Sequence, residues 1–290
     1  MTPKGKLIAV GGAEDKGTDL EAGIIQRNHL NFFEIGILKT ITKLLNDKSD
    51  RIEVVTTASS IPDEVGENYL DAFTKLGCTN VGHLKIRVRE DALQPQVVER
   101  IKQCKAVMFS GGNQLRLSSI FGGTEFLDVL HERYQNEDFL IAGTSAGAMA
   151  MSNTMIYEGN ATNAHLKGEV KITTGLGFIN KVIIDSHFNK RGRFPRLAQA
   201  VAANPGTIGI GLGEDTGVIV TNGEELHAIG SGAVMILDGR NIGYTNIADI
   251  DFDEPIAVEN LIVHILAKGN GYNVRTRKYS GAQVVVKPAE

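Results

Sequence analysis

Short apolar runs alternate with stretches of helical periodicity through the first half of the chain. The runs end in glycines or turn residues, which predicts strands, and between them apolar residues recur every three or four positions, which predicts helices. The predicted strands span residues 6–12, 52–57, 81–86, 106–109 and 139–142, and the predicted helices span 32–45, 63–76, 97–104 and 125–135. This alternation predicts a doubly wound, mostly parallel α/β sheet flanked by helices, with active-site residues at the carboxyl ends of its strands.

The second half of the chain is richer in strands. We expect a strand at 182–185 and a helix at 195–203, which begins with a proline, a residue favoured in the first turn. Short strands follow at 207–212, 218–221, 225–229 and 233–237, then a helix at 255–267 and a strand at 284–286. No low-complexity linker separates the halves, so we expect one domain, residues 1–290, with an antiparallel β-rich C-terminal extension.

Composition narrows the classes of function. The 290 residues carry a net charge of -4, which gives no broad basic surface and argues against nucleic acid as a partner. Cys78 and Cys104 are too few for a disulfide framework or a cysteine-built zinc site, so we expect free thiols. The chain shows no apolar signal segment and no stretch long enough to span a bilayer, which predicts a soluble, cytoplasmic protein without a membrane partner.

Residues Gly143-Thr144-Ser145-Ala146-Gly147 lie between a predicted buried strand and the small, helix-prone residues 148–151. A serine between two glycines at a strand-to-helix turn is the nucleophile-elbow pattern, in which the turn lifts the hydroxyl off the sheet. The glycines leave room for strand and helix to approach each other. We therefore predict acyl transfer through an ester on Ser145, and expect Ser145→Ala to abolish turnover without unfolding the protein.

A serine nucleophile needs a base within hydrogen-bond reach. Of the seven histidines, His187 directly follows the predicted strand 182–185, which places it on the same rim of the sheet as Ser145. It stands beside a run of cations, Lys190, Arg191, Arg193 and Arg196. The other histidines fall in segments where a packed or solvated side chain is the simpler interpretation. His187 is therefore the predicted base.

The base in turn needs an acid to orient it and to stabilise the imidazolium. Glu214 and Asp215 both follow the predicted strand 207–212, and the sequence alone does not choose between them. The turn 109–114 ends the strand that precedes the elbow strand. Its Gly111-Gly112 pair exposes backbone N–H groups, so we expect Gly112 to join Ala146 in an oxyanion hole, while Gln114 reaches into the substrate site.

In combination, these segments resemble the cyanophycinase family. The resemblance rests on residues 11–16, 109–114, 143–148, 185–188 with the arginines that follow, and 213–216, and it covers nearly the whole chain. It implies a flavodoxin-like or class I glutamine amidotransferase-like fold and a homodimeric serine peptidase without a metal. The implied substrate is cyanophycin, a poly-aspartate backbone with arginine on each side-chain carboxyl, which is shortened from its end to β-aspartyl-arginine dipeptides.

Carried over by position, the resemblance puts the nucleophile on Ser145, the base on His187 and the acid on Glu214, which leaves Asp215 a structural role. The implied substrate-site residues are Gln114, Asp185, Arg191, Arg193 and Arg196, and arginines suit the free carboxylates of the polymer. Glu14 and Asp15 are weaker candidates for contact with the substrate guanidinium. Ser186 stands where glutamine is expected, so we include it among the specificity residues.

Three alternatives remain open at this point. A related aspartyl or isoaspartyl dipeptidase would use the same elbow on another β-linked substrate. In an α/β-hydrolase-type esterase the histidine comes late in the chain, so His227 or His264 would be essential and His187 dispensable. A binding protein that keeps the fold without turnover would not react with a fluorophosphonate at Ser145.

Overall fold

The computed structural model describes residues 2–14, 16 and 36–282. Its centre is a sheet whose parallel half contains, side by side, β1 (Lys6–Val10), β5 (Leu140–Thr144), β4 (Ala106–Phe109), β2 (Ile52–Val55) and β3 (Val81–Leu84). These are the five strands predicted from the apolar runs, and each β–α–β connection between them keeps the strands parallel. Their carboxyl ends therefore lie along one edge of the sheet.

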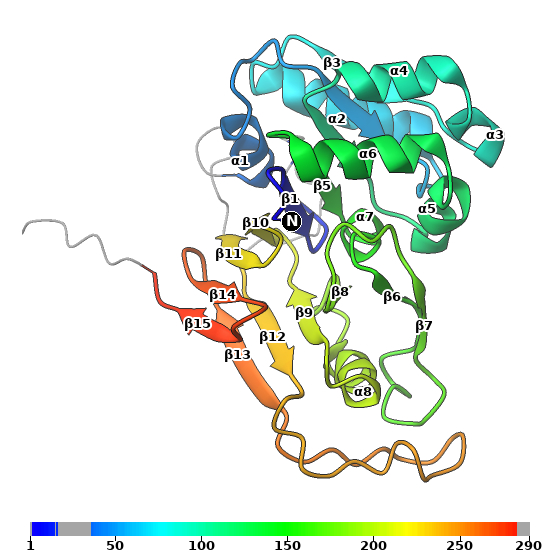
Figure 1. Ribbon diagram of the computed structural model, residues 1–290, viewed down its shortest axis with the longest axis vertical. Helices are drawn as coiled ribbons and strands as arrows, with labels where there is room; N and C mark the ends of the chain where they lie inside the picture. Colours follow the sequence, from blue (N-terminus) through cyan, green and yellow to red (C-terminus); the bar gives the residue numbers. More distant parts are fainter. Residues whose placement is uncertain (1, 15, 17–35, 283–290) are drawn as a thin grey trace, which may run out of the picture.

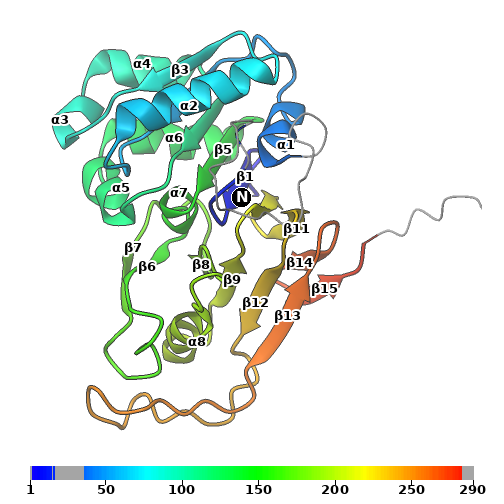
Figure 2. The same ribbon diagram turned by 180° about the vertical axis from the view of Figure 1, so that it is seen from behind.

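Helices cover both faces of this parallel half. Figures 1 and 2 show α1 (Ile37–Lys43) and α2 (Pro62–Lys75) on one face, and α4 (Pro95–Gln103) and α6 (Glu125–Asn136) on the other. The core divides accordingly, because neighbouring residues of a strand point to opposite faces. Leu7 and Ala9 of β1 belong to the cluster under α4 and α6, whereas Ile8 and Val10 belong to the cluster under α1 and α2.

An antiparallel extension continues the sheet beyond β1. It consists of β10 (Thr216–Thr221), β11 (Glu225–Gly230), β14 (Gly271–Asn273) and β15 (Lys278–Ser280), so that the whole sheet has nine strands. Asn222 and Gly223 both have positive φ, 56° and 71°, in the turn between β10 and β11. That conformation belongs to the tight hairpin turn which Asn-Gly favours, and the predicted β-rich extension is confirmed.

A second sheet of four strands lies below the parallel half of the first in Figure 1. Its strands are β8 (Val182–Asp185), β9 (Ile208–Leu212), β12 (Val234–Asp238) and β13 (Ile262–Leu266), and α8 (Phe194–Ala203) packs against it. The expectation that His187 and Ser145 share the rim of one sheet is therefore wrong, since β8 and β5 belong to different sheets. The short helix α7 (Ala146–Met149) contacts both β5 and β8 and so joins the two sheets.

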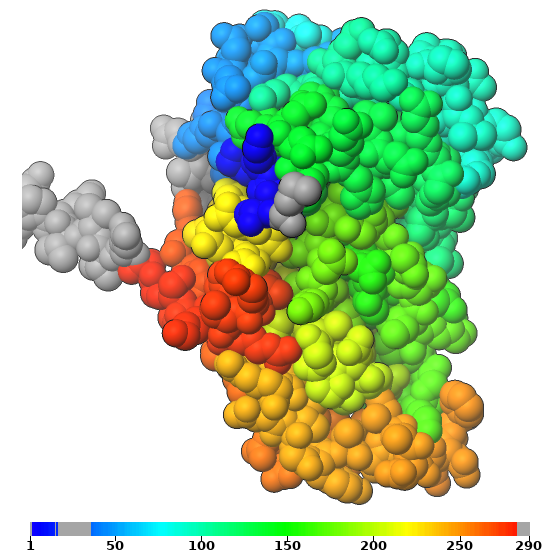
Figure 3. Space-filling view, viewed as in Figure 1, coloured from blue at the N-terminus to red at the C-terminus, as the bar shows by residue number. Residues whose placement is uncertain are grey.

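The prediction of a helix at residues 255–267 is also wrong. Residues 262–266 form β13, which pairs in register with β12 from Val234↔Leu266 to Asp238↔Ile262. The apolar positions of this segment fit a helical spacing, but its residues are mostly β-branched and the antiparallel partner satisfies their backbone. Figure 3 shows the preceding segment, residues 239–261, forming the lower end of the molecule.

Several elements are additions to the predicted pattern. They are α3 (Arg89–Ala92), α5 (Gln114–Phe121), the hairpin of β6 (Thr154–Glu158) and β7 (Lys171–Thr174), and strands β14 and β15. The predicted strand 284–286 and the beginning of the predicted helix 32–45 lie outside the described residues. In the described part of the chain, no helix is both long enough and apolar enough to cross a bilayer.

Candidate active site

Ser145 occupies the sharp turn between β5 and α7. Its backbone has φ 50° and ψ -110°, a conformation that residues with a side chain rarely adopt and that costs on the order of 1–3 kcal/mol. The Ser145 N–H donates to the carbonyl of Val10 at 2.8 Å, which ties the turn to the end of β1. The surrounding fold thus holds a strained serine with its hydroxyl clear of the sheet.

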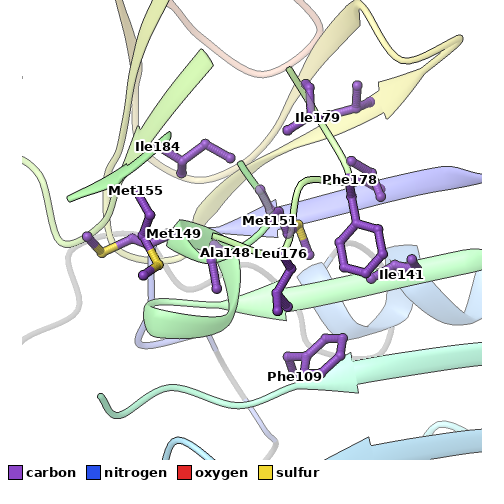
Figure 4. Close-up of a cluster of buried hydrophobic side chains, with 14 of the residues drawn as sticks. Phe109, Ile141, Ala148, Met149, Met151, Met155, Leu176, Phe178, Ile179 and Ile184 are labelled. Carbon is purple, nitrogen blue, oxygen red and sulfur yellow. The ribbon is translucent and has the colours of Figure 1, made fainter. Parts of the chain in front are cut away.

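The two flanking glycines are required by close approach. A Cβ on Gly147 would lie 2.5 Å from the carbonyl oxygen of Phe109, and one on Gly143 would lie 2.7 Å from the backbone of Gly147. Figure 4 shows the apolar side chains around α7, where Met149 and Met151 lie among residues from both sheets. The close approaches at Gly143 and Gly147 arise because the strands and the helix pack backbone against backbone, as the sequence pattern predicts.

Three side chains from separate strand ends meet at this turn. The Nε2 atom of His187 lies 3.2 Å from the Oγ atom of Ser145, and its Nδ1 atom lies 2.8 Å from Oε1 of Glu214. His187 follows β8 and Glu214 follows β9, the parallel pair at the edge of the second sheet. The His187 N–H donates to the carbonyl of Gly11 at 2.8 Å, which anchors the histidine to the first sheet.

The electrostatics suit an imidazole that accepts a proton. Burial lowers the pKa of His187, and the positive charge of Arg191 lowers it further against the opposing effect of Glu214. For Glu214, burial alone would raise the pKa, but hydrogen bonds with His187 and Lys190 outweigh it and the pKa is lowered. At neutral pH the pair is therefore a neutral imidazole beside an ionised carboxylate, the protonation state that a general base needs.

Gly12 supports the face of this imidazole. Its φ is 104°, and a Cβ there would lie 2.4 Å from Cε1 of His187. We expect Gly12→Ala to displace the ring and lower kcat/KM by about 100-fold or more, because a shift of about 1 Å in a catalytic group has that effect. Gly77→Ala is the matched control, since Gly77 also has positive φ but a Cβ would meet nothing within 4 Å. Equal peptidase kinetics for the two variants would contradict this role of Gly12.

The lowered pKa of His187 also predicts the pH dependence. Because the base must be neutral, the acidic limb of kcat/KM should lie below the ordinary range of histidine, about 6.5. Arg191→Gln removes a positive neighbour, so the pKa of His187 should rise and the limb should move to higher pH. Arg275→Gln, an exposed arginine paired with Glu224, should leave the limb in place. If the acidic limb of Arg191→Gln stayed at the wild-type pH or moved to lower pH, the assignment of this limb to His187 would be refuted.

The loop Gly111-Gly112 lies against the serine. A Cβ on Gly111 would lie 3.2 Å from Cβ of Ser145, and one on Gly112 would lie 2.0 Å from the carbonyl oxygen of Ala58. Ala146 is the first residue of α7, where backbone N–H groups have no partner within the helix. Among the described residues, neither the N–H of Gly112 nor that of Ala146 donates to a backbone carbonyl elsewhere in the fold, so both are available to an oxyanion.

A cavity of about 500 Å³ opens beside Ser145. Its walls include Gly12, Lys16, Tyr69, Gly112, His187 and Arg191. Sequence reasoning missed Lys16 and Tyr69 as site residues, since nothing local marks a lysine in a loop or a tyrosine on a helix as neighbours of Ser145. Of the residues predicted to contact substrate, Arg191 and Glu14 line this cavity.

The other predicted substrate contacts bond to one another, to the backbone or to the side chain of Met149. Asp185 is fully buried and pairs with Arg196, with Nε to Oδ2 at 2.6 Å, and with Arg193 at 3.2 Å. The Ser186 hydroxyl is buried and donates to Sδ of Met149 at 3.3 Å. Gln114 donates to the carbonyl of Ile156 at 2.9 Å. Direct contact between these side chains and substrate stays a prediction, and Asp15 lies outside the described residues.

The remaining residues singled out in the sequence, Asp215 and the two cysteines, have structural roles. Asp215 donates its N–H to the carbonyl of Gly12 at 2.9 Å and accepts from Oγ of Ser231 at 2.7 Å, so it stabilises the loop around the site. Cys78 and Cys104 are buried free thiols. No three His, Cys, Asp or Glu side chains of the described residues gather as a metal-binding group.

Comparison with known proteins identifies the class. The model of peptidase family S51 matches residues 30–229, more than half of the chain. The chain therefore belongs to peptidase family S51, and it is a peptidase. It is 35% identical over 275 residues to the cyanophycinase of Synechococcus elongatus, covering 95% of this chain and 81% of that protein. It is 34% identical to the cyanophycinase of Nostoc sp., covering 94% and 87%.

The solved structures agree on the fold. The crystal structure of a peptidase from an acI-B1 actinobacterium matches with a TM-score of 0.65 at 21% identity, covering 94% of this chain and 98% of that chain. A putative peptidase E from Listeria monocytogenes matches with a TM-score of 0.50 at 13% identity, covering 78% and 98%. At these identities the likeness concerns the fold alone, and it bears out the mostly parallel α/β sheet with antiparallel additions.

Proposed function

We propose that this chain is a serine exopeptidase that hydrolyses cyanophycin from its end and releases β-aspartyl-arginine dipeptides. The observation that carries the proposal is the placement of His187 between Ser145 and Glu214, at 3.2 Å and 2.8 Å, beside a cavity with a cationic wall. The substrate comes from relatives named cyanophycinase that align with nearly the whole chain. We further propose that the enzyme acts as a homodimer in the cytoplasm.

In the first half of the proposed reaction, Oγ of Ser145 attacks the carbonyl carbon of a backbone amide while its proton passes to Nε2 of His187. The N–H groups of Gly112 and Ala146 stabilise the oxyanion of the tetrahedral intermediate. As the C–N bond breaks, His187 gives the proton to the leaving nitrogen, and an ester on Ser145 remains. Glu214 stabilises the imidazolium throughout.

In the second half, a water molecule attacks the ester carbonyl and gives its proton to His187. The tetrahedral intermediate collapses, the bond to Oγ of Ser145 breaks, and His187 returns the proton to that oxygen. The product leaves with a new carboxylate, and the enzyme is restored. The lowered pKa values of His187 and Glu214 support this cycle, because both groups start in the protonation states it requires.

The experiment that tests the proposal compares three substrates. The protein is incubated separately with purified cyanophycin, an ordinary α-linked peptide and a simple ester, and the products are identified by mass spectrometry. We expect β-aspartyl-arginine from cyanophycin and no product from the other two. Cleavage of the α-linked peptide without release from cyanophycin would favour the aspartyl dipeptidase alternative, and turnover of the ester alone would favour the esterase.

A further inference from the structure

Besides Ser145 and His187, the wall of the cavity contains a buried carboxylate and the cation paired with it. Glu14 is only 4% exposed and accepts hydrogen bonds from the hydroxyl of Tyr69 and from Oγ1 of Thr144, the latter at 2.6 Å. Nζ of Lys16 lies 3.1 Å from Oε1 of Glu14. Thr144 immediately precedes Ser145, so this cluster is attached to the turn that holds the nucleophile.

Both oxygens of the Glu14 carboxylate are occupied by these donors. Burial alone would raise its pKa, but Lys16, Thr144 and Tyr69 together lower it, so Glu14 is ionised at neutral pH. Three donors, from Lys16, Thr144 and Tyr69, contact its two oxygens, and the Glu14 side chain is almost completely shielded from solvent. Glu14 is therefore poorly placed to bind a guanidinium group of the substrate, and its effect is to hold a cation in place.

Lys16 presents that cation to the cavity. Its side chain is 25% exposed, and Nζ lies 5.0 Å from the centre of the Tyr69 ring, within cation–π range. An ammonium has three N–H donors, of which Glu14 takes one, so donors remain for a ligand. Arg191 lies on the same wall, and among the described residues of the wall Glu14 is the one carboxylate.

We propose that Lys16 is a specificity-determining residue that binds a free carboxylate of the substrate beside Ser145, with Glu14 and Tyr69 positioning its ammonium. This inference rests on the proposed function, because each arginine of cyanophycin presents a free carboxylate to the enzyme. A compact ammonium suits such a group as a point charge, and the two cations that line this cavity, Lys16 and Arg191, favour a carboxylate over the guanidinium of the same residue.

The test uses Lys16→Met and Lys16→Arg in the full-length protein. Each is assayed on a short β-aspartyl-arginine oligomer and on the same oligomer with its arginine carboxylates converted to carboxamides. We expect Lys16→Met to raise KM for the carboxylate oligomer about tenfold with little change in kcat, because the contact exists before and during reaction. On the carboxamide oligomer, Lys16→Met and the wild type should have equal KM, and Lys16→Arg should retain most of the carboxylate preference.

Two controls separate binding from folding. Lys102→Met removes an exposed lysine paired with Glu125 and should match the wild type on both oligomers. Because Lys16→Met leaves the Glu14 carboxylate buried without its cation, the double variant Glu14→Gln with Lys16→Met repeats the comparison and should show the same selective loss. If Lys16→Met raised KM equally on both oligomers, or on neither, the proposed role of Lys16 would be overturned while the proposed function would stand. A wild-type protein that cleaves neither oligomer nor cyanophycin would overturn the proposed function together with it.

Discussion

Ser145→Ala should lower kcat on cyanophycin by at least about 10⁴-fold while the protein remains folded, since loss of a serine nucleophile removes the whole covalent pathway. Alanine keeps the strained backbone of this position, φ 50° and ψ -110°, and removes only Oγ. The melting temperature should therefore stay close to that of the wild type. Turnover rates by product release and thermal unfolding by circular dichroism measure the two quantities.

Ser145→Gly provides the matched variant. Glycine removes the same hydroxyl but adopts positive φ without strain, so activity should be lost equally while stability rises by about 1 kcal/mol. A variant pair with retained turnover would exclude Ser145 as the nucleophile. Loss of turnover accompanied by unfolding in both variants would instead assign Ser145 a structural role.

His187→Ala should reduce kcat about as severely, by about 10⁴-fold or more, because the nucleophile and its base act as one unit. The same substitution at His227 or His264 should leave kcat within about twofold. His264 lies on β13 with its ring 5.4 Å from that of Tyr272, and His227 lies on β11, paired with Ile219 of β10. Kinetics of the three variants on one substrate decide between them. An inactive His264→Ala or His227→Ala beside an active His187→Ala would establish the esterase order of residues.

The turn around Ser145 could be predicted because its determinants are local. A buried strand, two glycines and a run of small residues follow one another within about ten positions, and the contacts of Gly143 and Gly147 arise from that order. The same holds for the parallel strands, whose apolar runs reflect burial on both faces. His187 was predicted from its place after a strand, although the premise of a shared sheet was wrong.

What could not be predicted depends on segments that meet only in the folded chain. Glu214 and Asp215 are adjacent in sequence, and only the direction of each side chain separates the one that reaches His187 from the one that binds Ser231. Lys16 and Tyr69 come from a loop and from α2, and meet through Glu14. For residues 262–266 the helical spacing was misleading, because pairing with β12 overrides local periodicity.

The most direct test of the central claim is covalent labelling with a fluorophosphonate, followed by peptide mapping with mass spectrometry. A hydroxyl activated by His187 should react, so the wild-type protein should carry a single adduct on Ser145, and His187→Ala should carry almost none. An adduct on another residue, or equal labelling of Ser145 in both proteins, would contradict the pairing of these two side chains as nucleophile and base.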